Sequence, residues 1–118
     1  MVRVVRKQPF YWGDTLNGDK ANTNGNFPYG TKTVVANLAR TSVAGTYAKL
    51  AAHPWRLSDM SGNVWEWCDN LPTNSKQDSR VLRGGAWDCG AWNCRGAYRY
   101  ALAPADRTNY VGFRVCVE

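Results

Sequence analysis

The chain has 118 residues, of which 44% are hydrophobic, so it has the size and composition of one globular domain with its own core. No apolar run approaches membrane-spanning length, and residues 1–8 are too short and too charged for a signal peptide, so neither is expected in this chain. The formal net charge is +6, but the fifteen Lys and Arg residues are dispersed and form no nucleic-acid-binding motif, so no nucleic acid partner is expected.

The N-terminal half of the sequence predicts short elements separated by long loops. Residues 2–7 (VRVVRK) have the composition of a brief strand. Residues 15–33 are mostly Asn, Gly, Asp, Thr and Lys, which predicts a long loop. Residues 33–36 (TVVA) predict a second brief strand, and the alanine-rich residues 43–52 predict a short helix, although a glycine interrupts them.

The most patterned stretch is residues 56–70, with the sequence RLSDMSGNVWEWCDN. Residues 59–63 predict a turn, and the alternation that follows is typical of a strand. Trp65 and Trp67 then share one face of this strand. Two tryptophans on one strand face predict a hydrophobic core beneath them.

The opposite face of the same strand carries a charged residue, Glu66. A charge on an otherwise buried strand needs a partner, and the sequence offers two kinds: an ion pair with Arg114 or a bound cation. Asp59 and Glu66 lie seven residues apart across the turn, with the carbonyl groups of Gly62 and Val64 between them. Oxygen ligands of this kind suit calcium. The residues alone leave both alternatives open.

The last third of the chain, from Arg80 onwards, carries the functional segment. Residues 81–85 (VLRGG) open it as a strand, and residues 111–117 (VGFRVCV) close it with the alternation of a half-buried strand. The apolar face of that closing strand comprises Val111, Phe113, Val115 and Val117. Residues 86–110 between them show neither a helical period nor clean alternation, yet they are rich in Trp and Tyr. Aromatic residues on an irregular segment are typical of a binding surface.

Four cysteines are present, and their spacing matches no zinc-binding motif. Cys68 and Cys116 lie in apolar, strand-like runs, where a cysteine usually serves as a small buried hydrophobic residue, and they could pair if those strands adjoin. Cys89 and Cys94 are five residues apart in the irregular segment. This spacing is compatible with a disulfide, a metal site or a reactive pair.

Six motifs in this order resemble the formylglycine-generating enzyme and sulfatase-modifying family: FYWGD, GTKTV, LSDMSGNVWEWC, RVLRGGAW, CRGAYR and VGFRVC. The resemblance implies an α+β, C-type-lectin-like fold with short strands, long loops and one or two short helices. It spans about residues 9–117 and implies that residues 1–118 form a single domain, of which residues 1–79 are scaffold. The usual N-terminal portion of the enzyme domain has no counterpart in this sequence.

Within that family, the oxidases carry two cysteines after the RGG motif and use them for a copper-dependent oxidation of a substrate cysteine. Cys89 and Cys94 stand at the matching positions, and thiolates suit a soft copper ion. However, Ala86 stands where the oxidases have a serine, and most of their substrate groove belongs to the portion without counterpart. The resemblance therefore does not favour an enzyme, and a small copper oxidase is kept as the alternative.

The last third also resembles the variable protein of a diversity-generating retroelement, whose lectin-like domain ends in a segment that is mutated at the adenines of asparagine codons. The chain follows the fixed frame of such segments, from RGG through CR to GFRV, without a gap. The positions between the fixed residues are here called the candidate variable residues: Asp88, Cys89, Gly90, Trp92, Asn93, Tyr98, Tyr100, Ala101, Leu102, Ala103, Ala105, Asp106, Thr108, Asn109 and Tyr110. All except Trp92 can arise from an asparagine codon by changes at its two adenines.

This second resemblance implies a ligand-binding protein rather than an enzyme. Its partner would be a protein or another cell-surface ligand, and it would be displayed on a virus particle or a cell surface. The large aromatic side chains among the candidate variable residues would anchor the ligand. These are Trp92, Tyr98, Tyr100 and Tyr110.

The family resemblance also implies calcium, and no other cofactor is expected apart from copper under the oxidase alternative. The calcium ligands of the enzyme match Asp59, Gly62, Val64 and Glu66. A second family site would map to Asn22, Thr23, Asn26 and Pro28. The second set is the weaker match, because an asparagine replaces an acid at residue 26.

Overall fold

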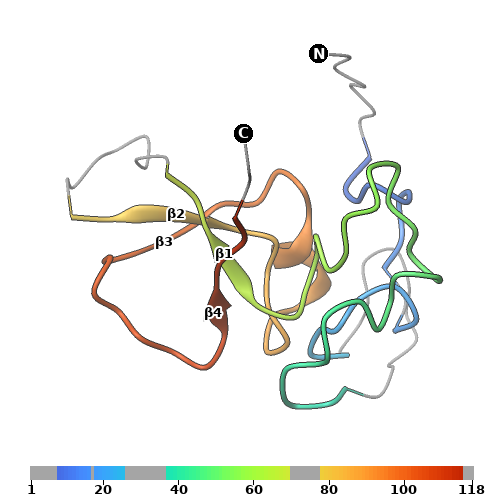
Figure 1. The fold of residues 1–118 in the computed structure, drawn as a ribbon, viewed down its shortest axis with the longest axis horizontal. Helices are drawn as coiled ribbons and strands as arrows, with labels where there is room; N and C mark the ends of the chain where they lie inside the picture. Colours follow the sequence, from blue (N-terminus) through green and yellow to red (C-terminus); the bar gives the residue numbers. More distant parts are fainter. Residues whose placement is uncertain (1–7, 17, 26–36, 70–77, 116–118) are drawn as a thin grey trace.

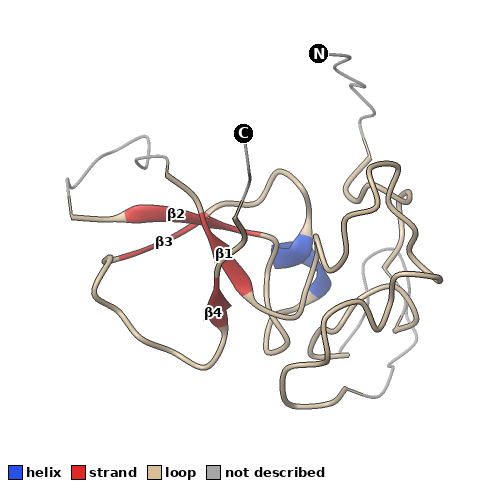
Figure 2. Ribbon diagram, viewed as in Figure 1, coloured by secondary structure: helices blue, strands red, loops and turns tan. Residues whose placement is uncertain are grey.

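The computed structural model describes residues 8–16, 18–25, 37–69 and 78–115. Within them, a four-stranded sheet and one short helix lie in the C-terminal half, while loops and turns make up the N-terminal half (Figures 1 and 2). The strands are β1 (Trp65–Trp67), β2 (Arg80–Arg83), β3 (Tyr100–Leu102) and β4 (Val111–Gly112), and the helix is the 3-10 helix η1 (Ala91–Cys94). The described part of the chain is therefore a mixed sheet with little helix, and none of its helices is long and apolar enough to cross a membrane.

The strand order in the sheet is β3-β2-β1-β4, which places the residues of the WEW motif at its centre. β2 pairs antiparallel with both β1 and β3, and Val81 lies opposite Ala101. β4 instead pairs parallel with β1, with Trp65 opposite Val111. A parallel pair requires a long crossover connection. Here, the chain after β1 therefore makes β2, η1 and β3 before it returns to the other side of β1.

A hydrophobic cluster formed by Trp65, Leu82 and Ala86 packs against one face of the sheet. Trp65 is 3% exposed, while Leu82 and Ala86 are fully buried. Trp67 is half-buried and packs against the same cluster. The prediction that the two tryptophans of β1 cover a core is therefore confirmed.

A second buried cluster joins the N-terminal segment to η1. Its members are Phe10, Leu16, Ala21, Ala91 and Cys94. Two backbone hydrogen bonds hold the same segments together: the Gly96 N–H donates to the Pro9 carbonyl at 2.7 Å, and the Asn24 N–H donates to the Cys89 carbonyl at 3.0 Å. The N-terminal segment therefore packs against η1 and the residues next to it, and backbone hydrogen bonds hold the two segments together.

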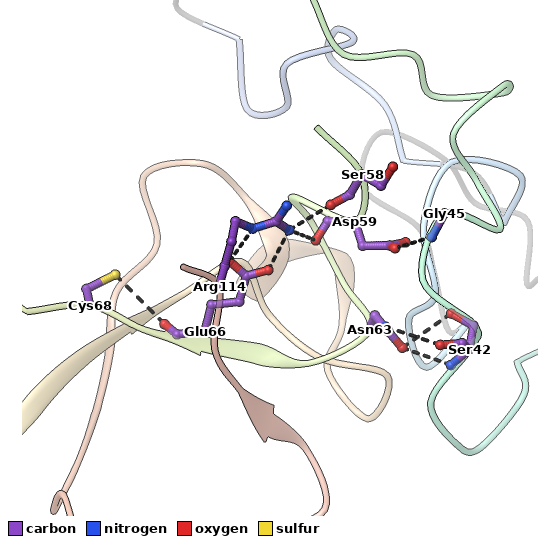
Figure 3. A network of polar contacts seen from close by, with 8 residues as sticks. All are labelled: Ser42, Gly45, Ser58, Asp59, Asn63, Glu66, Cys68 and Arg114. Carbon is purple, nitrogen blue, oxygen red and sulfur yellow. Dashed lines mark hydrogen bonds and ion pairs between the residues drawn. The ribbon is translucent and has the colours of Figure 1, made fainter. Parts of the chain in front are cut away.

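The turn before β1 is the junction between the loops and the sheet. Asp59, Gly62 and Asn63 all have positive φ angles, a conformation that Asp, Asn and Gly adopt more readily than other residues. The Asn63 side-chain oxygen accepts hydrogen bonds from the backbone N–H of Ser42, at 2.8 Å, and from its hydroxyl (Figure 3). The Asn63 backbone N–H donates to the carbonyl of Asn22. These bonds connect three loops to the start of β1.

The short helix expected at residues 43–52 is absent, and this prediction is wrong. The segment is a series of turns with isolated bonds, such as that from the Ala48 N–H to the Gly45 carbonyl at 3.0 Å. Gly45 has a φ of +83°, which a right-handed helix does not allow, and its N–H donates to the Asp59 carboxylate at 2.8 Å. The brief strands expected at residues 2–7 and 33–36 lie outside the described residues.

The strand expected at residues 111–117 is shorter than its alternation predicts. Only Val111–Gly112 pair with β1, and the side chains of Phe113 and Val115 are 78% and 75% exposed. An alternating pattern becomes a half-buried strand only where a partner strand and a core lie beside it. Beyond Gly112, Arg114 turns back to Glu66 instead, so the apolar face predicted for Phe113 and Val115 is not buried. Val117 lies outside the described residues.

Residues 86–110 are less irregular than the sequence indicates, because they contain both η1 and β3. β3 has the sequence YAL, which carries no alternation of polar and apolar residues, and its first two residues are exposed. Its extended conformation comes from three residue pairs with β2, one of which joins Leu82 to Tyr100. That pairing is a tertiary contact, so the sequence of residues 100–102 alone does not predict a strand.

Candidate functional site

A hollow of about 270 Å³ lies where β1, the turn after β2 and the residues that flank β3 and β4 converge. We call it the aromatic hollow, and it is lined by Trp65, Asp88, Cys89, Asn93, Tyr98, Tyr100 and Tyr110. Six of these seven residues are candidate variable residues, and the seventh belongs to the WEW motif. Residues that are up to 45 positions apart in the sequence therefore share one surface.

The central residue of the hollow is Trp65, which β1 holds against the core. Its indole ring contacts the ring of Tyr100, with centroids 5.2 Å apart, and the ring of Tyr98 at 5.9 Å. The Trp65 backbone N–H donates to the Tyr110 carbonyl at 2.8 Å, which places the third tyrosine beside it. Trp65 was expected only as a core residue, because a tryptophan on a strand face carries no sequence signal for a pocket.

The opposite wall of the hollow is the turn that carries Asp88 and Cys89. The N–H of Trp87 donates to the Asn63 carbonyl at 2.9 Å, and its indole N–H donates to the Asn109 carbonyl at 3.1 Å. The Cys89 N–H donates to the carbonyl of Ala86 at 3.0 Å and closes the turn. Backbone groups and one indole thus hold this wall, and the Cys89 side chain also packs against the buried clusters on both sides of it.

The remaining nine candidate variable residues lie outside the hollow: Gly90, Trp92, Ala101, Leu102, Ala103, Ala105, Asp106, Thr108 and Asn109. Most are exposed, and only Leu102 packs against the buried cluster under the sheet. The Asp106 carboxylate accepts a hydrogen bond from the Ala103 N–H at 3.2 Å, which braces the loop between β3 and β4. A ligand-binding role for these nine residues stays a prediction.

Cys68, Cys89 and Cys94 are free thiols, and Cys116 lies outside the described residues. Cys94 is fully buried beneath η1, and this burial raises the pKa of its thiol to about 12. Burial is also the main reason why the pKa of the Cys89 thiol is raised. Both thiols are therefore protonated at neutral pH, and copper would have to displace their protons to bind. Copper at this pair stays a prediction of the oxidase alternative. Ala86, at the position of the oxidase serine, is fully buried in the core and offers no hydroxyl group.

Of the two partners considered for Glu66, the structure shows Arg114. The guanidinium group binds the Glu66 carboxylate through two hydrogen bonds, of 2.7 and 3.0 Å, and also donates to the Ser58 carbonyl at 2.7 Å (Figure 3). A calcium ion at Asp59, Gly62, Val64 and Glu66 would have to displace this cation, so calcium there stays a prediction. A calcium-dependent rise in melting temperature that disappears in Asp59→Asn would test it.

The second expected calcium set is only partly described. Asn22 and Thr23 are 3% and 5% exposed, and they line a separate hollow of about 180 Å³. The Asn22 amide donates to the Arg40 carbonyl at 2.8 Å, so its side chain already serves the loop network. Asn26 and Pro28 lie outside the described residues. A metal ion at this set therefore also stays a prediction.

The sulfatase-modifying factor enzyme 1-like domain family has a model that matches residues 3–118, and the chain belongs to this family. The resemblance inferred from the six motifs is thereby confirmed. One protein that is similar in sequence and two that are similar in structure are given next.

Inactive C-alpha-formylglycine-generating enzyme 2 of Bos taurus is 33% identical over 84 residues, which cover 70% of this chain and 27% of the relative. Treponema denticola variable protein 1 is similar in structure, with a TM-score of 0.56 and 25% identity over 80% of this chain and 34% of that protein. PvdO from Pseudomonas aeruginosa shares the fold, with a TM-score of 0.63 and 24% identity over 89% of this chain and 42% of that protein. The chain thus spans less than half of the length of each of these proteins.

Proposed function

We propose that this chain is the ligand-binding variable protein of a diversity-generating retroelement. The observation that carries the proposal is the aromatic hollow, which six candidate variable residues from three loops, η1 and β3 line together. A shared surface for residues that alternate with the fixed frame is what a ligand-binding segment requires. The structural similarity to Treponema denticola variable protein 1 supports the same function.

The construction of the hollow suits a surface whose side chains change. Its walls are held by backbone bonds, such as those from Trp87 to Asn63 and from Asn24 to Cys89, and by the pairing of β2 with β3. Such contacts depend on the main chain and not on the identity of the variable side chains. Substitution at the candidate variable residues can therefore alter specificity without removing the scaffold.

The proposed ligand is a protein or another cell-surface molecule, and the proposed place of display is a virus particle or a cell surface. Exposed tyrosines give large contact areas at low cost in conformational entropy, and they dominate the known chemistry of protein-binding loops. Tyr100, which lines the hollow, is 37% exposed. Trp92, which precedes the lining residue Asn93 in the sequence, is 56% exposed. Both can contact a large partner directly.

A copper oxidase is less well supported by the same residues. Ala86, which is fully buried where the oxidases have a serine, offers no hydroxyl group for that reaction. A relative with 33% identity is itself named as inactive. We therefore propose a binding protein and not an enzyme.

Sequencing of the DNA that flanks this gene tests the proposal. A reverse-transcriptase gene and a near-copy of the codons for residues 80–114, differing only at adenines, are expected close by. The copy should carry asparagine codons at most of the candidate variable residues. A flanking region without such a copy, in isolates that all retain the same residues at 88–110, would rule out diversification.

A further inference from the structure

The walls of the aromatic hollow have an unusual chemical composition. Four aromatic rings line it, from Trp65, Tyr98, Tyr100 and Tyr110, together with the carboxylate of Asp88. None of the described residues that line it is a Lys, Arg or His, although the whole chain has a net charge of +6. The lining of the hollow therefore consists largely of aromatic rings and contains a carboxylate, although the protein as a whole is basic.

The tyrosines supply the accessible ring surface of the hollow. Trp65 is 3% exposed and contacts the rings of Tyr98 and Tyr100, which are tilted by 38° and 36° from its plane, whereas Tyr100 is 37% exposed. The face of an aromatic ring carries negative electrostatic potential, while its edge is positive. A group that enters between tilted rings meets such faces, and a cation within about 6 Å of a ring centroid is attracted to them.

The negative charge of the hollow comes from Asp88. Burial is the main reason why the pKa of Tyr100 and the pKa of the Cys89 thiol are raised, so both groups are uncharged at neutral pH. Asp88 supplies the only carboxylate among the residues that line the hollow, and no Lys, Arg or His in the lining offsets it. An anion that enters the hollow would be repelled by this carboxylate.

The same segment already holds a cation on an aromatic face. The Arg95 guanidinium carbon lies 3.4 Å from the centroid of the Trp92 ring, and the Arg95 Nε–H donates to the Trp92 carbonyl at 2.9 Å. This pair lies outside the lining of the hollow. It is one example in this segment of a guanidinium group bound to the face of an aromatic ring.

We propose that the aromatic hollow receives an organic cation, an alkylated ammonium or a basic side chain that the ligand displays. The inference rests on the proposed ligand-binding function and names the chemical class that this version of the site recognises. The rings of Tyr98, Tyr100 and Tyr110 attract the cation, and the Asp88 carboxylate supplies the counter-charge. A volume of about 270 Å³ suits one such group and not a whole ligand.

Small probes of matched shape test the role of charge. The full chain, labelled with ¹⁵N, is titrated with choline, with its neutral carbon isostere 3,3-dimethylbutan-1-ol, with butylammonium and with 3,3-dimethylbutanoate. Shifts of the backbone amides of residues 87–89 and 98–110 report on binding. We expect at least one of the two cations to bind about tenfold or more tightly than the isostere, and the anion not to bind. Choline and butylammonium then distinguish a quaternary headgroup from a lysine-like side chain.

Variants at two positions, Asp88 and Tyr100, separate the contributions of charge and ring face. Asp88→Asn keeps the size of the side chain, and we expect it to weaken binding of the preferred cation by about three- to tenfold. Tyr100→Leu should weaken it by a similar factor, whereas Tyr100→Phe, which keeps the ring face, should stay within about twofold of the parent. Asp19→Asn and Trp55→Leu remove an exposed carboxylate and an exposed ring elsewhere, and they should change nothing.

Each remaining outcome overturns the inference. Equal binding of the isostere and the cations, or preferential binding of the anion, would leave the hollow as a ligand site and the proposed function intact, but would refute recognition of a cation. Absence of shifts at residues 87–89 and 98–110 with every probe, in a protein whose spectrum remains folded, would also refute it. The proposed function itself fails only through the flanking DNA, so the two failures are distinguishable.

Discussion

Gly85 shows how closely single residues constrain the segment that carries the site. It has a φ of +75°, and a Cβ atom built there would collide with the Sγ and lie 2.9 Å from the Cα of Cys94. The second glycine of the RGG motif is therefore required for two reasons: its positive φ favours glycine, and the close approach of η1 leaves no room for a side chain. The sequence contained the motif, but only the structure shows what it accommodates.

Gly85→Ala should lower the free energy of unfolding by about 2–5 kcal/mol, because it adds left-handed strain to overpacking of Cys94. Urea unfolding followed by tryptophan fluorescence measures the change. Gly90→Ala is the matched control, since its φ is −66° and the nearest atom to the new methyl group would be 4.0 Å away. The control should stay within about 0.5 kcal/mol of the parent. Equal losses in both variants would contradict the structure.

The buried thiol of Cys94 gives a second prediction at this scale. Its pKa of about 12 lies above the ordinary value of 9.0, so the native state binds the proton more tightly than the unfolded state. The resulting stabilisation is complete below pH 9 and is lost as the pH rises from 9 towards 12. Cys94→Ala removes the titrating group and leaves a small cavity, so it should lower the stability at pH 8 but weaken the alkaline loss. Unfolding curves of both proteins at pH 8 and pH 10.5 would measure the difference.

Alkylation at pH 8 checks the same burial independently. Iodoacetamide should modify Cys94 only after the protein unfolds in urea, because a buried and protonated thiol reacts slowly. Mass spectrometry of the peptides then locates the label. Rapid modification of Cys94 in the native protein would show that the second hydrophobic cluster is open.

At the scale of the elements, β1 joins two different environments. One face places Trp65 against the core and at the base of the hollow, and the other places Glu66 against Arg114. The ion pair connects β1 to the chain immediately after β4, over a sequence separation of 48 residues. It therefore fixes the last strand where the parallel ladder is only two residues long.

A double-mutant cycle with Glu66→Gln and Arg114→Gln should give a coupling energy of about 0.5–1.5 kcal/mol. This is above the value for a fully exposed pair, because the contact is bidentate and the two side chains are 21% and 31% exposed. The coupling should decrease in 1 M salt, which screens exposed charges. Measurement of all four proteins by urea unfolding tests it, and a coupling of zero would mean that the pair does not stabilise β4.

Prediction of the elements from the sequence succeeded where the pattern and the tertiary environment agree. The turn at residues 59–63 and the strand with Trp65 and Trp67 are present, because two buried rings on one face leave few alternatives. The helix at residues 43–52 failed because alanine content cannot reveal the positive φ of Gly45. β3 was missed for the opposite reason: its strand conformation depends on β2 and not on its own side chains.

At the scale of the whole molecule, the two hydrophobic clusters meet at one residue. Cys89 packs against both the cluster under the sheet and the cluster beneath η1. The aromatic hollow opens above this junction, so the ligand site lies where the two halves of the core touch. Several exposed candidate variable residues lie outside it, among them Ala101 on β3 and Ala103, Ala105 and Asp106 on the loop that leads to β4.

This separation predicts that the variable surface and the scaffold respond differently to substitution. Ala101→Tyr and Ala105→Asp, at exposed positions, should change the free energy of unfolding by no more than about 0.5 kcal/mol. Leu82→Ala, at a fully buried position, should cost about 2–5 kcal/mol. Thermal and urea unfolding of the three variants decide the matter. Comparable losses at all three positions would mean that scaffold and variable surface are not separate.

The sequence by itself determined the family, the position of the central strand and the segment in which the site lies. These features are written in short motifs and in local periodicity, which neighbouring residues decide among themselves. Only the tertiary structure decided which candidate variable residues meet in the hollow, that Trp65 forms its base, and that Glu66 binds Arg114. Trp65 contacts Tyr98 and Tyr100 across 33 and 35 positions, and Glu66 binds Arg114 across 48 positions, so local sequence patterns cannot specify these contacts.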